Sequence, residues 1–409
     1  MATSEQQQRF TKWACAITCL IAFQGYLAAL LTPALARTLH ASKLTLGFSI
    51  PAFAIPFGVS SFLSATIACS IDRRRYLRWL IFLMGLLLVI IAVARDAFLF
   101  LIVRICLGAL SGGIMQIIMS VINDLFTPPD RTKLFIRIIL AFAAGMTFGP
   151  SLGIWLYPVI GWQWTFGLTG FWAMLILYYA LKYDGIIHSG HGGFISRQRI
   201  LKRMRIVFTN FYNRRIYTFI FLNGVFHSGL FVWTSYYFSV GYRLGYQGTG
   251  LVLLIFSLPG LLLAASIGTA TRRYGVKAMV FSGISVISLT IVIFVWHAGI
   301  WLTLTAVPFL SIGYVMTQPF YSGVIEYIKR NRNREFALGL GFGCLFLGYG
   351  TGPVFFQLLF LKSAVPGVLV LILIEVLLMR IAVTSSFTKH VSILDIGVGP
   401  YNIENHDIP

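Results

Sequence analysis

Charged residues are scarce in this chain of 409 residues. They make up 11% of the sequence, whereas a soluble domain carries about 25%. Acidic residues are the rarest, with 12 Asp and Glu against 32 Lys and Arg. So little charge excludes a water-soluble enzyme and indicates a protein that lies in a lipid bilayer.

Cysteine is sparse, and the motifs of common metal and nucleotide sites are missing. The five cysteines lie in apolar stretches without a CxxC pair, so we expect packing side chains and neither a disulfide framework nor a zinc site. The chain contains no HExxH motif and no G-x4-GK[ST] phosphate-binding loop. We therefore expect no metal, no cofactor and no ATP hydrolysis within this chain.

Apolar residues make up 58% of the sequence and gather in long runs. A transmembrane helix needs about 20 such residues, so the sequence predicts an all-α membrane protein with about twelve spans. The predicted spans are 13–36, 44–70, 77–94, 97–121, 134–158, 161–182, 216–240, 247–270, 277–296, 299–325, 336–361 and 364–384.

The basic residues lie almost entirely on one side of these spans. If the spans alternate in direction, 26 of the 32 Lys and Arg fall on the side of both termini, 5 fall on the other side, and Arg104 lies within the fourth span. Cytoplasmic loops of membrane proteins carry an excess of Lys and Arg. Both termini are therefore predicted to be cytoplasmic, and the net charge of +20 requires no nucleic-acid partner.

A basic stretch divides the spans into two sets of six. We expect an N-terminal six-helix bundle at 1–183, a cytoplasmic basic linker at 184–215, a C-terminal six-helix bundle at 216–388 and a cytoplasmic tail at 389–409. Basic residues recur at helical spacing between Arg197 and Arg205. This pattern fits either a short amphipathic helix along the membrane or a solvated linker.

The two halves resemble each other weakly. Asp72 and Arg272 occupy corresponding positions in the loops after the second and eighth spans, 200 residues apart. The segments Gly145–Pro150 and Gly348–Pro353 both read G-x3-G-P, in the fifth and eleventh spans, at an offset of 203. A parallel repeat of six helices predicts a substrate site near the membrane midplane, between the halves.

Two motifs in the first half are similar to those of a known family. The loop after the second span is similar to G-x3-D-[RK]-x-G-[RK]-[RK], with Asp72 and Arg73 in place but with Ala68 and Arg75 where glycine is usual. The fourth span is similar to R-x3-G-x3-G and begins this motif at Arg104.

A third motif lies in the fifth span, where Gly145, Gly149, Pro150 and Gly153 are similar to the helix motif of drug/proton antiporters. With the three motifs in this order, the chain resembles the major facilitator superfamily over nearly its whole length. Within that family it resembles the twelve-helix drug/proton antiporter branch.

The resemblance implies two pseudo-symmetric six-helix bundles that rock and expose a central site to each side of the membrane in turn. It also implies that Asp72 and Arg73 latch one state at the cytoplasmic side, and that Arg104 takes part in proton coupling. The glycine stripe of the fifth span, kinked by Pro150, is expected to pack closely on a neighbouring helix. We expect that helix to be the eighth span, so that the contact seals the pathway against proton leak.

Three ionisable residues within spans are candidates for coupling. Arg104 lies about 10 Å deep at 1.5 Å per residue, where it either faces a cavity or partner or reaches back to the interface. Glu375, near the middle of the twelfth span, is either a locally paired buried carboxyl or a coupling residue. His227, in the seventh span, is either a packing residue or a proton-transfer group.

The first, fourth, seventh and tenth spans line the central cavity in the family that the chain resembles. The polar and aromatic residues of these spans are the substrate-cavity candidates: Gln24, Tyr26, Gln116, Asn223, Trp233 and Gln318. Such a pocket, with one cation, suits neutral or anionic amphipathic solutes. The first span carries no carboxylate, although drug antiporters often have one there for cationic substrates.

We therefore expect a secondary active transporter, namely a proton-coupled exporter of hydrophobic or amphipathic small molecules. The alternative is an uptake symporter or uniporter for a small neutral or anionic solute, which the degenerate loop motif and the missing first-span acid favour. A membrane-embedded enzyme would need polar catalytic residues clustered at one depth, whereas here they are scattered.

The expected partners are a small-molecule substrate, a proton or other coupling ion, and the lipid bilayer, with the chain acting as a monomer. The loops are compact and the chain has no Asn-x-Ser/Thr acceptor. These features favour the cytoplasmic (inner) membrane of a bacterium.

Overall fold

The computed structural model of this protein describes residues 4–67, 72–182, 211–296, 299–318, 334–360 and 364–384. The predicted linker up to residue 210, the predicted tail and the loop residues 68–71 lie outside these ranges. Within the ranges every regular element is a helix, which confirms the all-α prediction.

The helices of the first half are α1 (Ser4–Thr38), α2 (Lys43–Gly47), α3 (Ser49–Ile67), α4 (Arg73–Ala92), α5 (Ala97–Leu125) and α6 (Pro128–Lys182). The second half contains α8 (Phe211–Tyr236), the π-helix η1 (Tyr237–Gly241), α9 (Tyr246–Tyr274), α10 (Val276–Val295), α11 (Ile300–Thr317), α13 (Arg334–Phe360) and α14 (Ala364–Thr384). Helix α8 begins five residues before the predicted start of the second bundle at 216.

Helix α6 is two helices joined at a break. Its 55 residues would extend about 80 Å at 1.5 Å per residue, far beyond a hydrocarbon core of about 30 Å. Gly161 interrupts it with φ 76° and ψ 163°, a conformation that residues with a Cβ rarely adopt. The break separates the predicted fifth and sixth spans.

In the described residues, nine helices are long and apolar enough to cross a membrane. The number is ten if the bent pair Gln247–Leu263 and Ser266–Tyr274 counts as one span. One of the nine, Lys133–Ala180, has 48 residues and contains the Gly161 break. The structure thus confirms a helical multi-span protein, and the count of twelve stays a prediction.

Local sequence signals mark several helix ends. Asp96 caps α5 by accepting a hydrogen bond from the Leu99 N–H at 2.8 Å, and Ser42 caps α2 by accepting from Thr45 at 2.9 Å. Helix α9 ends at Tyr274, and the next residue, Gly275, caps it with a φ of 83° before α10 begins.

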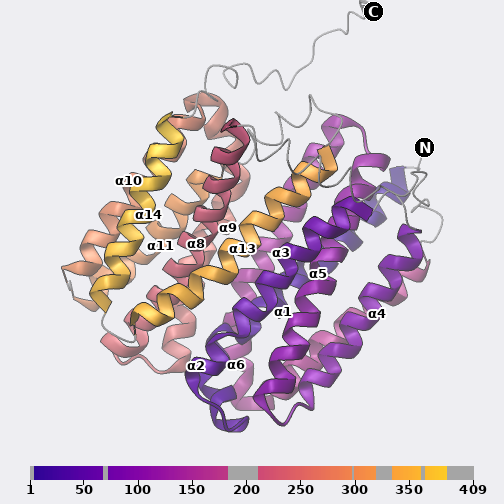
Figure 1. Cartoon of the computed structure of the whole chain (residues 1–409), viewed down its shortest axis with the longest axis horizontal. Coiled ribbons are helices and arrows are strands. Elements are labelled where there is room, and N and C mark those ends of the chain that lie inside the picture. Colours follow the sequence, from indigo (N-terminus) through magenta and orange to yellow (C-terminus); the bar gives the residue numbers. More distant parts are fainter. Residues whose placement is uncertain are drawn as a thin grey trace, which may run out of the picture.

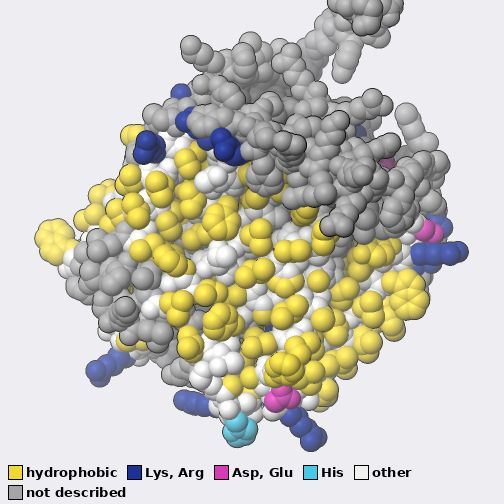
Figure 2. Space-filling model, viewed as in Figure 1, with side chains coloured by type: hydrophobic (Ala, Val, Ile, Leu, Met, Phe, Trp, Pro, Cys, Tyr) yellow, Lys and Arg dark blue, Asp and Glu magenta, His cyan; other side chains and the backbone are white. Residues whose placement is uncertain are grey.

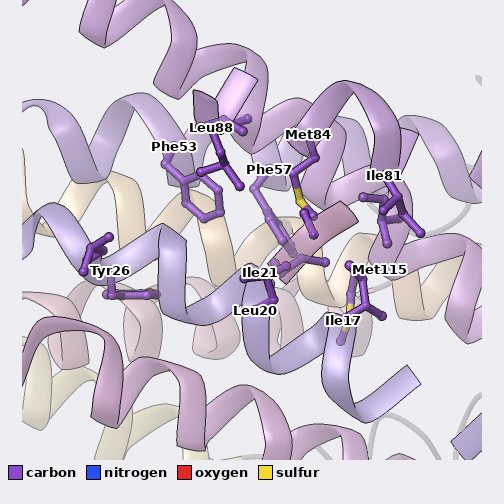
Figure 3. Close-up of a cluster of buried hydrophobic side chains, with 14 of the residues drawn as sticks. Ile17, Leu20, Ile21, Tyr26, Phe53, Phe57, Ile81, Met84, Leu88 and Met115 are labelled. Carbon is purple, nitrogen blue, oxygen red and sulfur yellow. The ribbon is translucent and has the colours of Figure 1, made fainter. Parts of the chain in front are cut away.

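Each half has its own hydrophobic core. Figure 3 shows part of the first core, where side chains of α1, α3, α4 and α5 interlock, among them Ile17, Phe53, Phe57, Met84 and Met115. The second core is built from α8 to α14. Residues Phe346 and Tyr349 of α13 belong to the first core, so the two halves are joined by packing.

The outer surface is apolar, as a lipid-facing surface must be. Hydrophobic side chains cover the face seen in Figure 2, and Lys and Arg lie near its rim. Trp164, Trp296 and Trp301 are strongly exposed near helix breaks or ends, where tryptophan is favoured at a membrane interface.

The halves lie side by side, with α13 of the second half resting on the first (Figure 1). Two helix pairs make the main contact, α3 with α13 and α6 with α9. At the first pair, a Cβ on Gly58 would lie 2.7 Å from the carbonyl oxygen of Gly343, so the backbones nearly touch.

Candidate functional site

Arg104 is fully buried and joins three helices. From α5, its Nη1 donates a hydrogen bond to the carbonyl oxygen of Gln24 at 2.9 Å, and its Nη2 donates to that of Gly25, both in α1. Its Nε donates to the carbonyl oxygen of Ser49 in α3 at 3.2 Å. The ring of Phe53 lies 4.8 Å from the guanidinium carbon. Arg104 therefore has partners deep in the bundle and does not reach back to the interface.

The side chain of Gln24 extends this network. Its Oε1 accepts from Arg104 at 3.3 Å, and its Nε2 donates to the hydroxyl of Ser111 at 3.3 Å. In the described part of the chain, the partners of the guanidinium are carbonyl and amide oxygens and not carboxylates. The carbonyl and amide oxygens therefore stabilise the positive charge of Arg104 beside the middle of α1.

The glycines of the Arg104 motif bring α5 onto α3. Gly108 and Gly112 lie one turn apart on the face of α5 that also carries Arg104. A Cβ on either glycine would overlap a backbone carbonyl oxygen of α3, that of Phe53 or Phe57. The R-x3-G-x3-G pattern thus allows the close approach that lets Arg104 reach Ser49.

The glycine stripe of α6 packs on α1. A Cβ on Gly145 would overlap the carbonyl oxygen of Cys19, one on Gly149 would lie 2.5 Å from the carbonyl oxygen of Phe23, and one on Gly153 would lie 2.5 Å from Leu27. The expectation that the stripe faces the eighth span is therefore wrong. The predicted close packing does occur, but against the first span.

Helix α6 meets the predicted eighth span, α9, through other residues. The Ser151 hydroxyl donates to the carbonyl oxygen of Gly250 at 3.4 Å, and Ile154 packs with Leu253. Gly149 to Gly153 also spell G-x-S-x-G, a pattern of hydrolase nucleophiles. Here Ser151 lies inside a helix and its hydroxyl also donates to Thr147 at 3.3 Å, so the strand-to-helix elbow of such enzymes is absent.

The second half repeats this arrangement. A Cβ on Gly348 of α13 would overlap the carbonyl oxygen of Phe221 in α8, and one on Gly352 would lie 2.7 Å from that of Val225. The fifth span therefore packs on the first, and the eleventh on the seventh. This agrees with the repeat expected from the G-x3-G-P segments.

Aromatic side chains meet where the halves join. The rings of Tyr26 in α1 and Tyr349 in α13 lie 6.3 Å apart and nearly perpendicular. His227 of α8 stacks on Tyr314 of α11 with centroids 3.7 Å apart, and it lies 5.7 Å from Tyr349. The structure thus brings the candidates Tyr26 and His227 together through Tyr349.

The remaining cavity candidates are dispersed. Gln116 is buried in α5 and accepts from Ser61 at 3.5 Å, and Asn223 donates to Thr317 at 2.9 Å. Trp233 lies in the second core, 5.1 Å from the ring of Phe294. Gln318 follows the end of α11, and its Nε2 has no hydrogen-bond partner in the described residues.

Glu375 lies inside the second half. Its Oε2 accepts a hydrogen bond from Ser288 of α10 at 2.9 Å, while its Oε1 is buried without a hydrogen-bond partner among the described residues. The carboxyl therefore sits between α10 and α14. This geometry matches the locally paired carboxyl, one of the two possibilities left open by the sequence.

Asp72 and Arg73 act at the start of α4. Asp72 caps this helix by accepting from the N–H groups of Arg74 and Arg75 at 3.1 and 3.3 Å. Arg73 is buried and pairs with Asp124 at the end of α5. The pair fastens two neighbouring helices of the first half at one end of the bundle.

Sequence reasoning missed Tyr314, Tyr349 and Ser288. Tyr349 lies between Gly348 and Gly352 of the repeated G-x3-G-P segment, but a lone tyrosine in an apolar run gives no signal of its own. Ser288 is 87 residues from Glu375, and nothing in the sequence connects the two.

Comparison with known proteins identifies similar chains. The family model described as Major Facilitator Superfamily matches residues 14–353. The "Uncharacterized MFS-type transporter YbcL" of Bacillus subtilis (strain 168) is 22% identical over 342 residues, which cover 80% of this chain and 85% of that protein.

Two solved structures have a similar fold. The human organic anion transporter MFSD10 (TETRAN) has a TM-score of 0.68 at 16% identity, over 93% of this chain and 100% of that chain. The proton:xylose symporter XylE, bound to 6-bromo-6-deoxy-D-glucose, has a TM-score of 0.71 at 14% identity, over 93% and 95%. At these identities the likeness concerns the fold alone.

Proposed function

Because the chain belongs to the Major Facilitator Superfamily and is a multi-pass membrane transporter, we propose that it exports hydrophobic or amphipathic small molecules in exchange for protons. Two six-helix bundles, 1–183 and 216–388, rock about the contacts of α3 with α13 and α6 with α9. The linker and tail lie in the cytoplasm, in the orientation given by the basic residues. The chain acts as a monomer in the cytoplasmic membrane of a bacterium.

The observation that carries this proposal is the fixed charge of Arg104. Its guanidinium binds the carbonyls of Gln24 and Gly25, directly before Tyr26, which touches the second half through Tyr349. Two positive charges repel strongly in a region of low dielectric constant. A proton that enters this interface is therefore destabilised by Arg104, and it leaves before the next substrate enters.

His227 is the group that we assign to carry the proton. It lies at the contact between the halves, against Tyr314 and Tyr349, and its Nδ1 is buried without a hydrogen-bond partner in the described part of the chain. Imidazole can gain and lose a proton near neutral pH. Glu375 is a weaker candidate, since its carboxyl faces Ser288 inside the second half.

Close packing supports tight coupling. Gly145, Gly149 and Gly153 press α6 onto α1, while Ser151 and Ile154 hold α6 against α9. Helix α6, with its motif at Pro150, therefore contacts both halves with little free space. We propose that this helix prevents protons from crossing without substrate.

The other end of the first half supplies a latch. We propose that Asp72, Arg73 and Asp124 hold the cytoplasmic ends of α4 and α5 in one state and separate in the other. The position of Arg73 supports this role, because its buried side chain pairs with Asp124, whose carboxylate is half-exposed at the end of α5 and can therefore separate from it.

An uptake symporter or uniporter for a small neutral or anionic solute is the second candidate. It is favoured by the partners of Arg104, which in the described residues are oxygens of Gln24, Gly25 and Ser49 and include no carboxylate. Drug/proton antiporters often carry an acid in the first span, and the first span of this chain has none.

Purified protein in proteoliposomes tests the proposal. A pH gradient is imposed, internal pH is followed with a trapped dye, and amphipathic drugs, sugars and metabolites are added in turn. Antiport predicts that a transported compound dissipates the gradient, that Arg104→Gln abolishes this response, and that Arg104→Lys retains part of it. Substrate flux without any proton movement would refute antiport and leave the uniporter. Melting temperatures of each variant separate lost coupling from lost folding.

A further inference from the structure

Five aromatic side chains from five helices form one cluster at the contact between the halves. They are Tyr26 of α1, His227 of α8, Phe256 of α9, Tyr314 of α11 and Tyr349 of α13. His227 stacks on Tyr314 at 3.7 Å with 20° between the rings, and lies 6.0 Å from Phe256. We call this group the aromatic cluster. Tyr26, Phe256, Tyr314 and Tyr349 are buried, so the cluster lies inside the protein.

Two polar atoms of the cluster are buried and lack a hydrogen bond within the part of the chain that the structure describes. Neither Tyr26 Oη nor His227 Nδ1 has a hydrogen-bond partner among the described residues. The hydroxyls of Tyr314 and Tyr349, by contrast, bond to each other at 2.8 Å. A buried polar group without a partner is costly and needs an explanation, such as a ligand that supplies the missing bond. The rings of Tyr26 and His227 lie 6.3 and 5.7 Å from the ring of Tyr349, so both polar residues border the same ring and one ligand can reach both.

Charge limits what this ligand can be. The cluster contains neither a carboxylate nor a cationic side chain, apart from what His227 gains on protonation. The nearby guanidinium of Arg104 points to the carbonyls of Gln24 and Gly25, and its face is covered by Phe53. A charged ligand would lose its hydration here without an ion-pair partner from the cluster.

We infer that the substrates are uncharged, planar aromatic compounds that carry a hydroxyl or carbonyl group, bound by the aromatic cluster. The ring of the ligand packs against the outside of the cluster, since His227 and Tyr314 already stack on each other, and its polar group bonds Tyr26 Oη and His227 Nδ1. The sequence predicted a neutral or anionic substrate, and this inference restricts the substrate to neutral compounds. The inference rests on the proposed function, since it concerns the substrate of the same central site.

A matched set of probes on one ring system tests the inference. Naphthol is neutral with a hydroxyl, naphthalene is neutral without one, naphthoate is an anion and naphthylmethylammonium is a cation. Binding to the full-length protein in lipid nanodiscs is measured by calorimetry, with empty nanodiscs subtracted for partition into lipid. We expect naphthol to bind at least tenfold more tightly than the other three probes.

Two conservative variants locate the contact. Tyr26→Phe and His227→Phe keep an aromatic ring and remove one polar atom each. Each is expected to weaken naphthol binding about tenfold, as loss of one hydrogen bond to a buried partner does, and to leave naphthalene binding unchanged. Tyr179→Phe is the control, because Tyr179 lies exposed on α6 away from the cluster.

Three outcomes would overturn the inference: no binding of any probe, tighter binding of naphthoate or naphthylmethylammonium, or equal loss of naphthol and naphthalene affinity in Tyr26→Phe. Failure of the proposed function looks different. In that case naphthol binds in a Tyr26-dependent way, yet proteoliposomes show no proton movement with any hydroxylated aryl compound.

Discussion

Adding one methyl group at Gly149 tests whether α6 and α1 must touch for the transporter to work. In Gly149→Ala the new Cβ would lie 2.5 Å from the carbonyl oxygen of Phe23 and 3.0 Å from its Cα. Ordinary contacts of a Cβ begin at 3.4 Å. The obstacle is backbone on both sides, so no side chain can turn aside and the helices must separate by roughly 1 Å.

The expected penalty follows from this overlap. Inserting a methyl group into a closely packed interior costs about 1–3 kcal/mol. In a domain about as large as one half of this chain, each kcal/mol lowers the melting temperature by about 2–4 °C. Gly149→Ala should therefore melt several degrees below the unmodified protein, and its widened α1–α6 contact should raise the substrate-independent proton leak.

Gly167→Ala is the matched control, in the second part of α6 beyond the Gly161 break. Its new Cβ would have Ala92 as its nearest neighbour, at 3.8 Å, so it fits without movement. Alanine also favours a helix over glycine by about 1 kcal/mol, so this variant should melt at the same temperature or slightly higher. Thermal melting in detergent and dye-detected leak in proteoliposomes provide the readouts. If both variants behave alike in both assays, the close-packing argument is refuted.

Three further experiments test the latch, the carboxyl of Glu375 and a buried hydrogen bond in the second half. A double-mutant cycle of Arg73→Ala and Asp124→Asn, measured by thermal melting, should give a coupling of about 1 kcal/mol, and additive effects would contradict the pair. Glu375→Gln should keep substrate-driven proton movement, since the side chain faces α10; loss of coupling with normal folding would reinstate it as a proton site. Asn223→Ala should cost about 0.5–1.5 kcal/mol by removing its hydrogen bond to Thr317, and an unchanged melting temperature would show that this bond contributes nothing.

The sequence was most informative where one helix determines its own geometry. The spacing of Gly145, Gly149 and Gly153 predicted a smooth helix face for close packing, and the structure has one. Apolar run lengths predicted the helices, and the polar Asp96 marks the start of α5. These features depend on neighbours within one or two turns, which the sequence displays directly.

Contacts between helices that are distant in the sequence could not be predicted from it. The stripe of α6 was expected on the eighth span but packs on the first, because both neighbours offer an apolar face and only the tertiary arrangement selects one. For Arg104 the sequence left a cavity, a partner and the interface open, and the partner that it has is the backbone of Gln24 and Gly25, about 80 residues away. Every residue carries a backbone carbonyl, so the residue types in the sequence do not show which carbonyl will accept such a hydrogen bond.

The central claim is exchange of a neutral substrate for protons, and the direction of substrate accumulation tests it most directly. Proteoliposomes are loaded with buffers that set a series of pH gradients, and uptake of a radiolabelled hydroxylated aryl compound is measured at steady state. A compound that protein-free liposomes take up slowly is chosen. Antiport predicts accumulation that grows as the interior is made more acidic than the exterior, and its loss in Arg104→Gln. Accumulation that grows with an alkaline interior, or that ignores the gradient, would contradict antiport in favour of symport or a uniporter.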